Sequence, residues 1–111
     1  MNDKRGSPRV DCELIVEYGV ENGLAQRGRM ANIGIRGALL MTEAATPPAG
    51  TVLLLRFQLP LSRRPVKTYA RVKWASLRRI GVEFVHLTFQ EQEEIWRFYA
   101  RESAWQRDLE P

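Results

Sequence analysis

The sequence of 111 residues has a single cysteine, Cys12, and a single histidine, His86. One cysteine excludes an internal disulfide, and one cysteine with one histidine cannot assemble an ordinary zinc site, so we expect no metal. The sequence also lacks a Ser-His-acid arrangement, a Walker loop and the glycine pattern of dinucleotide-binding domains. Because these motifs are absent, we expect neither an enzyme nor a cofactor.

Long hydrophobic runs are missing as well. The longest apolar stretch, residues 52–61, is interrupted by Arg56 and Gln58, so it cannot span a bilayer. The N-terminus is charged and has no apolar centre, which is not the pattern of a secretory signal. A single cysteine also fits a reducing compartment. We therefore expect a cytoplasmic protein that does not insert into a membrane.

The composition that is present indicates one soluble domain with a mild basic excess. The chain is long enough for a single core, and its 44% hydrophobic and 27% charged residues are ordinary for a globular protein. Seventeen Lys and Arg against thirteen Asp and Glu give a formal charge of +4. This excess suits an anionic partner such as a nucleotide, although many basic domains have no such partner.

Alternating apolar and polar residues predict several short strands. The first alternation places Val10, Cys12, Leu14, Val16 and Tyr18 on one face, so we interpret Cys12 as a small core residue rather than a reactive thiol. Turn residues separate the strands, which indicates an antiparallel sheet closed into a small barrel or sandwich. The expected strands are residues 10–18, 26–33, 37–42, 53–59, 66–74 and 80–84.

The last part of the chain has the pattern of a helix. Thr88 and Glu91 have the spacing of a capping box, and bulky residues follow at helical spacing from Ile95 to Tyr99. We expect this helix to pack on the open end or the side of the barrel. Trp105 lies beyond the firm pattern and is assigned neither to the core nor to a partner surface.

Two short segments have the chemistry of an anion-binding site. Arg5 and Arg9 flank a glycine, a serine and a proline, and two guanidinium groups can close on phosphates as a fork. The second segment offers the amide of Asn32 together with Gly34 and Gly37, where a backbone can approach a flat ligand closely. Each segment alone also has an ordinary interpretation, because arginine pairs occur by chance and Asn and Gly are common in turns and bulges.

The order of these segments resembles the PilZ domain family. The resemblance runs from Lys4 to about Glu102 and includes residues 81–84, which are similar to the last strand of that family. It implies a mainly β fold, a six-stranded antiparallel barrel with a C-terminal α-helix. It also implies a mobile ligand-binding segment at residues 1–9, a single barrel domain with its helix at 10–103, and a tail at 104–111.

The resemblance implies a ligand and a role for each matched residue. The ligand of this family of bacterial receptors is cyclic di-GMP, whose phosphates and guanine edges Arg5 and Arg9 are expected to grip while stacking on the bases. Asn32 is expected to accept a hydrogen bond from a guanine amine, and Gly37 to turn the backbone. Lys4 and Arg36 are candidate secondary contacts.

Gly34 departs from the family pattern, which usually has serine at this position. Glycine lacks the hydroxyl, and a lost hydrogen bond costs on the order of 1 kcal/mol. From the sequence we therefore expect the substitution Gly34→Ser to tighten ligand binding. The same departure leaves open a degenerate domain that binds no nucleotide and acts only as a protein-interaction adaptor.

The function implied by the resemblance is that of a stand-alone receptor. Ligand would order the N-terminal arginine segment and change the surface offered to an unidentified effector protein that controls motility, surface attachment or polysaccharide output. A nucleic-acid interface on Lys67, Tyr69, Arg71 and Lys73 is a third alternative. It ranks below the others, because one tyrosine among three cations is a thin stacking platform.

Overall fold

The computed structural model describes residues 8–21 and 23–109, with side chains up to Gln106. Six strands precede one helix, in the order that the sequence predicts. Their bounds are Val10–Gly19 (β1), Gln26–Ile33 (β2), Gly37–Met41 (β3), Val52–Phe57 (β4), Val66–Ser76 (β5), Arg79–His86 (β6) and Phe89–Leu109 (α1).

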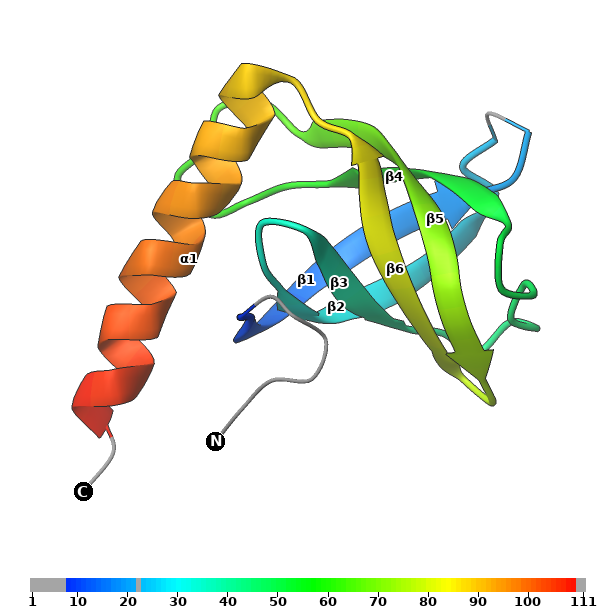
Figure 1. Ribbon diagram of the computed structural model, residues 1–111, viewed down its shortest axis with the longest axis horizontal. Helices are drawn as coiled ribbons and strands as arrows, with labels where there is room; N and C mark the ends of the chain where they lie inside the picture. The colour runs from blue at the N-terminus through cyan, green and yellow to red at the C-terminus, as the bar shows by residue number, and fades with distance from the viewer. Residues whose placement is uncertain (1–7, 22, 110–111) are drawn as a thin grey trace.

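The six strands form a closed antiparallel barrel (Figure 1). The strand order around the barrel is β1-β2-β3-β6-β5-β4, and the pairing of β1 with β4 closes it. Neighbours in sequence are joined by hairpins, except where the chain crosses from β3 to β4. The mainly β fold with a six-stranded barrel and a C-terminal helix, expected from the sequence, is confirmed, and the sandwich alternative is excluded.

The alternation of residues along β1 separates a side that faces the core from a side that faces solvent. Val16 and Tyr18 are buried, whereas Asp11, Glu13 and Ile15 are exposed. The Tyr18 hydroxyl donates a hydrogen bond to Thr42 Oγ1 at 2.6 Å, so the phenol is satisfied inside the core. Burying one such aliphatic or aromatic side chain contributes about 1.5–3 kcal/mol, which makes the strand faces the main source of stability.

Two irregularities in strand pairing lie close to the start of β1. The register of β1 against β2 shifts between Asp11 and Leu14, and that of β2 against β3 shifts between Met30 and Asn32. Such bulges bend a strand and change the direction of a side chain. The two shifts therefore shape the barrel rim that contains Arg9, Asn32 and the turn that follows.

Helix α1 begins with the expected capping box and lies across one end of the barrel (Figure 1). The Thr88 N–H donates to Glu91 Oε1 at 3.0 Å, and the Glu91 N–H donates to Thr88 Oγ1 at 3.1 Å. Ile95 and Phe98 belong to the core cluster, so the predicted packing of the helix on the barrel is confirmed.

The helix continues to Leu109, beyond the point where the sequence pattern weakens. Residues 104–109, assigned to a tail from the sequence, are helical, and Gln106 Nε2 donates to the Asp11 carbonyl at 3.1 Å. This contact attaches the last turns to β1, although Trp105 is 59% exposed. Within the described residues, no helix is long and apolar enough to cross a membrane.

Candidate functional site

The second predicted motif forms the turn between β2 and β3. Asn32 is the penultimate residue of β2, and Gly37 is the first residue of β3. The Gly34 N–H donates to the Gly37 carbonyl at 2.9 Å and closes the turn. The amide side chain and both glycines therefore lie within one short stretch at the rim of the barrel.

Arg9 directly precedes β1 and lies beside this turn. Strand pairing places Val10 opposite Ile33 and Asp11 opposite Asn32, so the residue before β1 lies next to the turn. Arg9 Nη1 donates a hydrogen bond to Asn32 Oδ1 at 3.4 Å, and both side chains are partly buried. One arginine of the first motif thus contacts the first residue of the second motif, although 23 positions separate them.

Gly34 fits closely against the segment that carries Arg9. A Cβ atom at this position would collide with the Pro8 carbonyl oxygen and would lie 3.1 Å from Arg9 Cγ. Only a residue without a side chain allows this approach unless the segment moves. A serine at this position would first have to displace Pro8 and Arg9, a steric cost that the prediction of tighter binding from the sequence did not include.

Gly37 is fixed on the opposite side of the turn, against β6. A Cβ atom there would collide with the Val82 carbonyl oxygen and would lie 3.2 Å from Glu83 Cα. The Phe84 N–H also donates to the Arg36 carbonyl at 2.8 Å. The turn is thus held between the segment that precedes β1 and strand β6. The close approach of Pro8 requires a glycine at Gly34, and that of Val82 requires a glycine at Gly37. We call Arg9, Asn32, Gly34 and Gly37 the turn site.

Among the described residues, the remaining predicted contact, Arg36, lies apart from Arg9 and Asn32. Arg36 is exposed and lines a separate hollow of about 380 Å³ beside β6 and the first turn of α1. Its neighbours there include Glu83, Phe84 and Gln92. Lys4 and Arg5 lie outside the described residues.

Cys12 lies on β1 close to the turn site and packs against the core. Its Sγ donates to the Met30 carbonyl at 3.4 Å. Burial, followed by the charges of Asp11, Glu102 and Glu13, raises the pKa of the thiol from 9.0 to about 12. The thiolate is the reactive form, so the interpretation of Cys12 as a packed residue agrees with its surroundings.

The sequence did not indicate the contacts made by Pro8 and Val82. Both act through backbone carbonyl oxygens that limit the space at Gly34 and Gly37. A carbonyl group is present at every residue, so only the pairing of the strands identifies these two. The described residues contain no group of three or more His, Cys, Asp or Glu side chains that could hold a metal ion.

The basic face of β5 carries less free charge than the sequence suggests. Lys67, Tyr69, Arg71 and Lys73 are all exposed along one strand, as expected. However, Lys73 Nζ lies 3.7 Å from Glu83 Oε1, and Arg71 Nη1 donates to the Gly50 carbonyl at 3.4 Å. The Glu83 carboxylate therefore offsets part of the charge of Lys73, which reduces the charge available to a phosphate backbone, whereas Arg71 keeps its charge and directs one N–H at a carbonyl.

Comparison with known proteins found one matching family model and several solved structures of similar fold. The family model of the PilZ domain matches residues 3–101. No curated protein matches the chain in sequence.

Among solved structures, the inhibitor of motility (MotI/DgrA) of Bacillus subtilis has a TM-score of 0.80 at 21% identity, over 96% of this chain and 54% of that one. The PilZ domain of YcgR from Escherichia coli, with c-di-GMP, has a TM-score of 0.72 at 12% identity, over 96% of both chains. The PilZ domain of CeSA from a cellulose-synthesizing bacterium has a TM-score of 0.67 at 20% identity, over 86% of this chain and 97% of that one. The TM-scores establish similarity of fold, and the chain spans about half of the motility inhibitor.

Proposed function

The chain belongs to the PilZ domain family, and from this premise we propose that it is a receptor for cyclic di-GMP (c-di-GMP). The observation that carries the proposal is the hydrogen bond from Arg9 Nη1 to Asn32 Oδ1. It joins the two motifs at one rim of the barrel, which a shared ligand requires. The YcgR domain, of similar fold, was solved with c-di-GMP, which supports this choice of ligand.

Arg9 is the proposed phosphate ligand on the described part of the chain. A guanidinium group offers parallel N–H donors that match a phosphate or the edge of a guanine, and it keeps its charge at physiological pH. The contact with Asn32 holds the guanidinium beside the turn before ligand arrives. Arg5 is the proposed second arginine, and Lys4 and Arg36 are proposed secondary contacts.

The turn supplies the surface on which a base can lie. Asn32 can accept a guanine amine through Oδ1, the atom that now accepts from Arg9. Ligand binding would therefore exchange one hydrogen bond for another, while Arg9 transfers to the ligand. Gly34 and Gly37 are buried against Pro8 and Val82, so their proposed role is to let the turn pack closely and to hold Asn32 and Arg9 side by side for the ligand.

The proposed output is a change of surface. In this proposal residues 1–9 close over the ligand, residues 10–103 form the receptor domain, and the altered rim is offered to an effector in the cytoplasm. The effector would control motility, surface attachment or polysaccharide output. A similar fold occurs in a protein described as an inhibitor of motility, which supports the first of these outputs.

A second candidate function is that of an adaptor that binds no nucleotide. The observation in its favour is Gly34, where the family usually has a serine hydroxyl. In that case the contact of Arg9 with Asn32 would only stabilise the rim, and the partner surface would be permanently available.

Titration calorimetry with c-di-GMP distinguishes the two functions. We expect saturable binding to the unmodified protein and a loss of about a hundredfold in Arg9→Ala, equivalent to two charge-assisted hydrogen bonds. Arg27→Ala, which removes an exposed arginine from β2, is the matched control and should bind normally. A folded protein that releases no heat at high ligand concentration would contradict the receptor and support the adaptor.

A further inference from the structure

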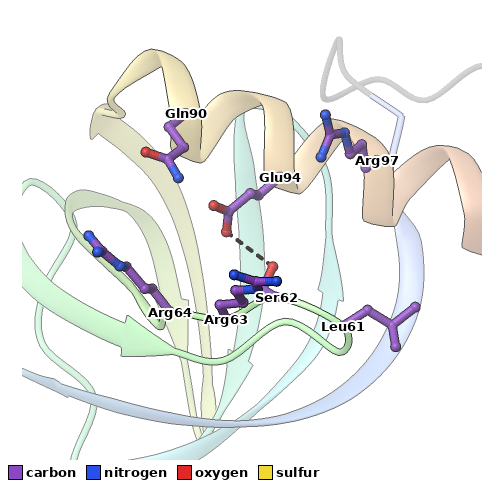
Figure 2. Close-up of a pocket in the computed structure, with 7 residues that line it drawn as sticks. All are labelled: Leu61, Ser62, Arg63, Arg64, Gln90, Glu94 and Arg97. Atoms are coloured by element: carbon purple, nitrogen blue, oxygen red, sulfur yellow. Dashed lines mark hydrogen bonds between the residues drawn. The ribbon is translucent and has the colours of Figure 1, made fainter.

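A second hollow lies between the β4–β5 loop and the first half of α1 (Figure 2). Its volume is about 510 Å³. We call it the arginine hollow, and it is lined by Leu61, Ser62, Arg63, Arg64, Gln90, Glu94 and Arg97. None of these residues belongs to the turn site.

The loop that forms one wall of the arginine hollow is held in place by its neighbours. Gln58 Nε2 donates to the Ser62 carbonyl at 2.7 Å, and the Ser62 N–H donates to the Leu59 carbonyl at 3.1 Å. The Ser62 hydroxyl donates to Glu94 Oε1 at 3.0 Å and attaches the loop to α1 (Figure 2). The side chains on this loop are therefore presented from a fixed backbone.

Positive charge dominates the arginine hollow. Arg63 and Arg64 are exposed, and neither has an ion-pair partner among the described residues. Arg97 adds a third guanidinium, paired with Glu93 at 2.9 Å on the helix surface. Guanidinium groups are weakly hydrated and bind carboxylates in a forked geometry, so such a cluster favours an acidic partner.

Leu61 places an apolar side chain at the edge of the same hollow. It is 87% exposed, and its φ of 69° lies in the left-handed region, which branched and bulky residues rarely adopt. Figure 2 shows it at the opposite edge from Arg64. Arginine is enriched at protein interfaces, and the exposed Leu61 beside Arg63 and Arg64 offers an apolar contact next to charged ones.

We propose that the arginine hollow docks an acidic segment of the effector protein, with carboxylates on Arg63, Arg64 and Arg97 and an apolar residue against Leu61. Glu94 favours a polypeptide over a small phosphate compound. Its carboxylate lies between the loop and the helix, where it would repel a compact anion of high charge. An extended segment can place its carboxylates on either side of Glu94 and donate a backbone N–H to it.

This inference names the surface that the effector of the proposed function would use. Because its test contains no nucleotide, it is separate from the test of c-di-GMP binding. A failure of peptide binding would leave the turn site unaffected, and a failure of nucleotide binding would leave the docking surface intact in an adaptor.

The test uses the full chain labelled with ¹⁵N and a short synthetic peptide in which leucines interrupt a run of glutamates. A matched peptide has glutamine in place of every glutamate. We expect the acidic peptide to shift the amide signals of residues 61–64 and 90–97, and the glutamine peptide to leave them unchanged. Shifts of equal size with both peptides, or no shifts with either, would overturn the proposal.

Charge reversal identifies the arginines responsible. Arg63→Glu combined with Arg64→Glu should weaken the acidic peptide at least about tenfold, the equivalent of one charge-assisted hydrogen bond. Arg27→Glu combined with Arg79→Glu changes the net charge equally at exposed positions elsewhere and should have a smaller effect. Equal losses in the two double variants would show attraction by net charge alone and would overturn the site.

Inorganic pyrophosphate serves as the competitor for a small anion. We expect it to leave the amide signals of residues 61–64 unchanged at concentrations where the acidic peptide saturates them. Saturable shifts with pyrophosphate, together with displacement of the peptide, would assign the arginine hollow to a phosphate compound instead and would overturn the proposed protein partner.

Discussion

The turn site and the arginine hollow both contain arginine, but they present it in different ways. At the turn site Arg9 is partly buried and donates to Asn32, and the backbone around it is packed so closely that Gly34 and Gly37 leave no room for side chains. In the arginine hollow Arg63 and Arg64 are exposed on a fixed loop and have no ion-pair partner among the described residues.

This difference indicates two kinds of recognition. A closely packed turn with one held guanidinium suits a small ligand, because few side chains must be ordered when the ligand binds. An open surface with separated guanidinium groups and an exposed Leu61 fits a wider partner that supplies several contacts. We therefore propose nucleotide binding for the first region and effector binding for the second.

The largest effect that we expect on folding comes from Gly37. The substitution Gly37→Val places a branched side chain against the Val82 carbonyl in the β3–β6 pairing, where neither strand can withdraw. We expect a loss of about 3 kcal/mol in the free energy of unfolding, the upper range for overpacking. Urea denaturation followed by circular dichroism measures it. An unchanged midpoint would mean that β6 does not hold the turn.

Gly34 provides the contrasting substitution in the same turn. Gly34→Ser meets Pro8, which precedes the first strand and can move, so we expect a stability loss below about 1 kcal/mol. Ligand affinity should fall about tenfold because Arg9 moves with Pro8. Calorimetry and urea denaturation of the same sample give both values. Tighter binding would show that the added hydroxyl outweighs the displacement.

Asn32 tests the polar half of the turn site. Asn32→Ala removes the acceptor for Arg9, and we expect c-di-GMP affinity to fall about fivefold, as for a hydrogen bond of about 1 kcal/mol. Asn32→Asp keeps an acceptor and adds a negative charge that attracts Arg9, so this variant should retain part of the affinity that the alanine variant loses. Equal affinity of the alanine variant and the unmodified protein would remove Asn32 from the site.

Cys12 gives the smallest expected effect on binding and a defined pH dependence. The folded thiol has a pKa of about 12 against 9.0 in the unfolded chain, so above pH 9 the unfolded chain loses its proton first. The stability present below pH 9 is therefore lost as the pH rises toward 12. The rate of alkylation by iodoacetamide should reach half of its maximum near pH 9 only in urea. A half-maximal rate near pH 9 in the folded protein would contradict a buried thiol.

Alternation along residues 10–18 and 66–74 was sufficient to predict an antiparallel barrel or sandwich, and the resemblance to the PilZ family implied the six-stranded barrel. The capping box at Thr88 likewise predicted the start of α1. The end of the helix was predicted too early, because the contact of Gln106 with Asp11 joins residues that are distant in sequence. Long-range contacts of this kind leave no local pattern.

The candidate site was predicted only as a set of residue types. The pairing of Arg9 with Asn32 follows from the register of β1 against β2, and the register depends on a bulge between Asp11 and Leu14. From the sequence we interpreted Gly34 as the loss of a serine hydroxyl, whereas the structure shows that Gly34 lies against the Pro8 carbonyl. The steric reason for a glycine is visible only when its neighbour in space is known.

The measurement that tests the central claim most directly is an amide chemical-shift titration of the ¹⁵N-labelled chain with c-di-GMP. We predict saturable shifts at Arg9, Asn32, Gly34 and Gly37, with residues 61–64 of the arginine hollow unchanged. Shifts confined to residues 61–64, or none anywhere in a folded protein, would contradict the assignment of c-di-GMP to the turn site.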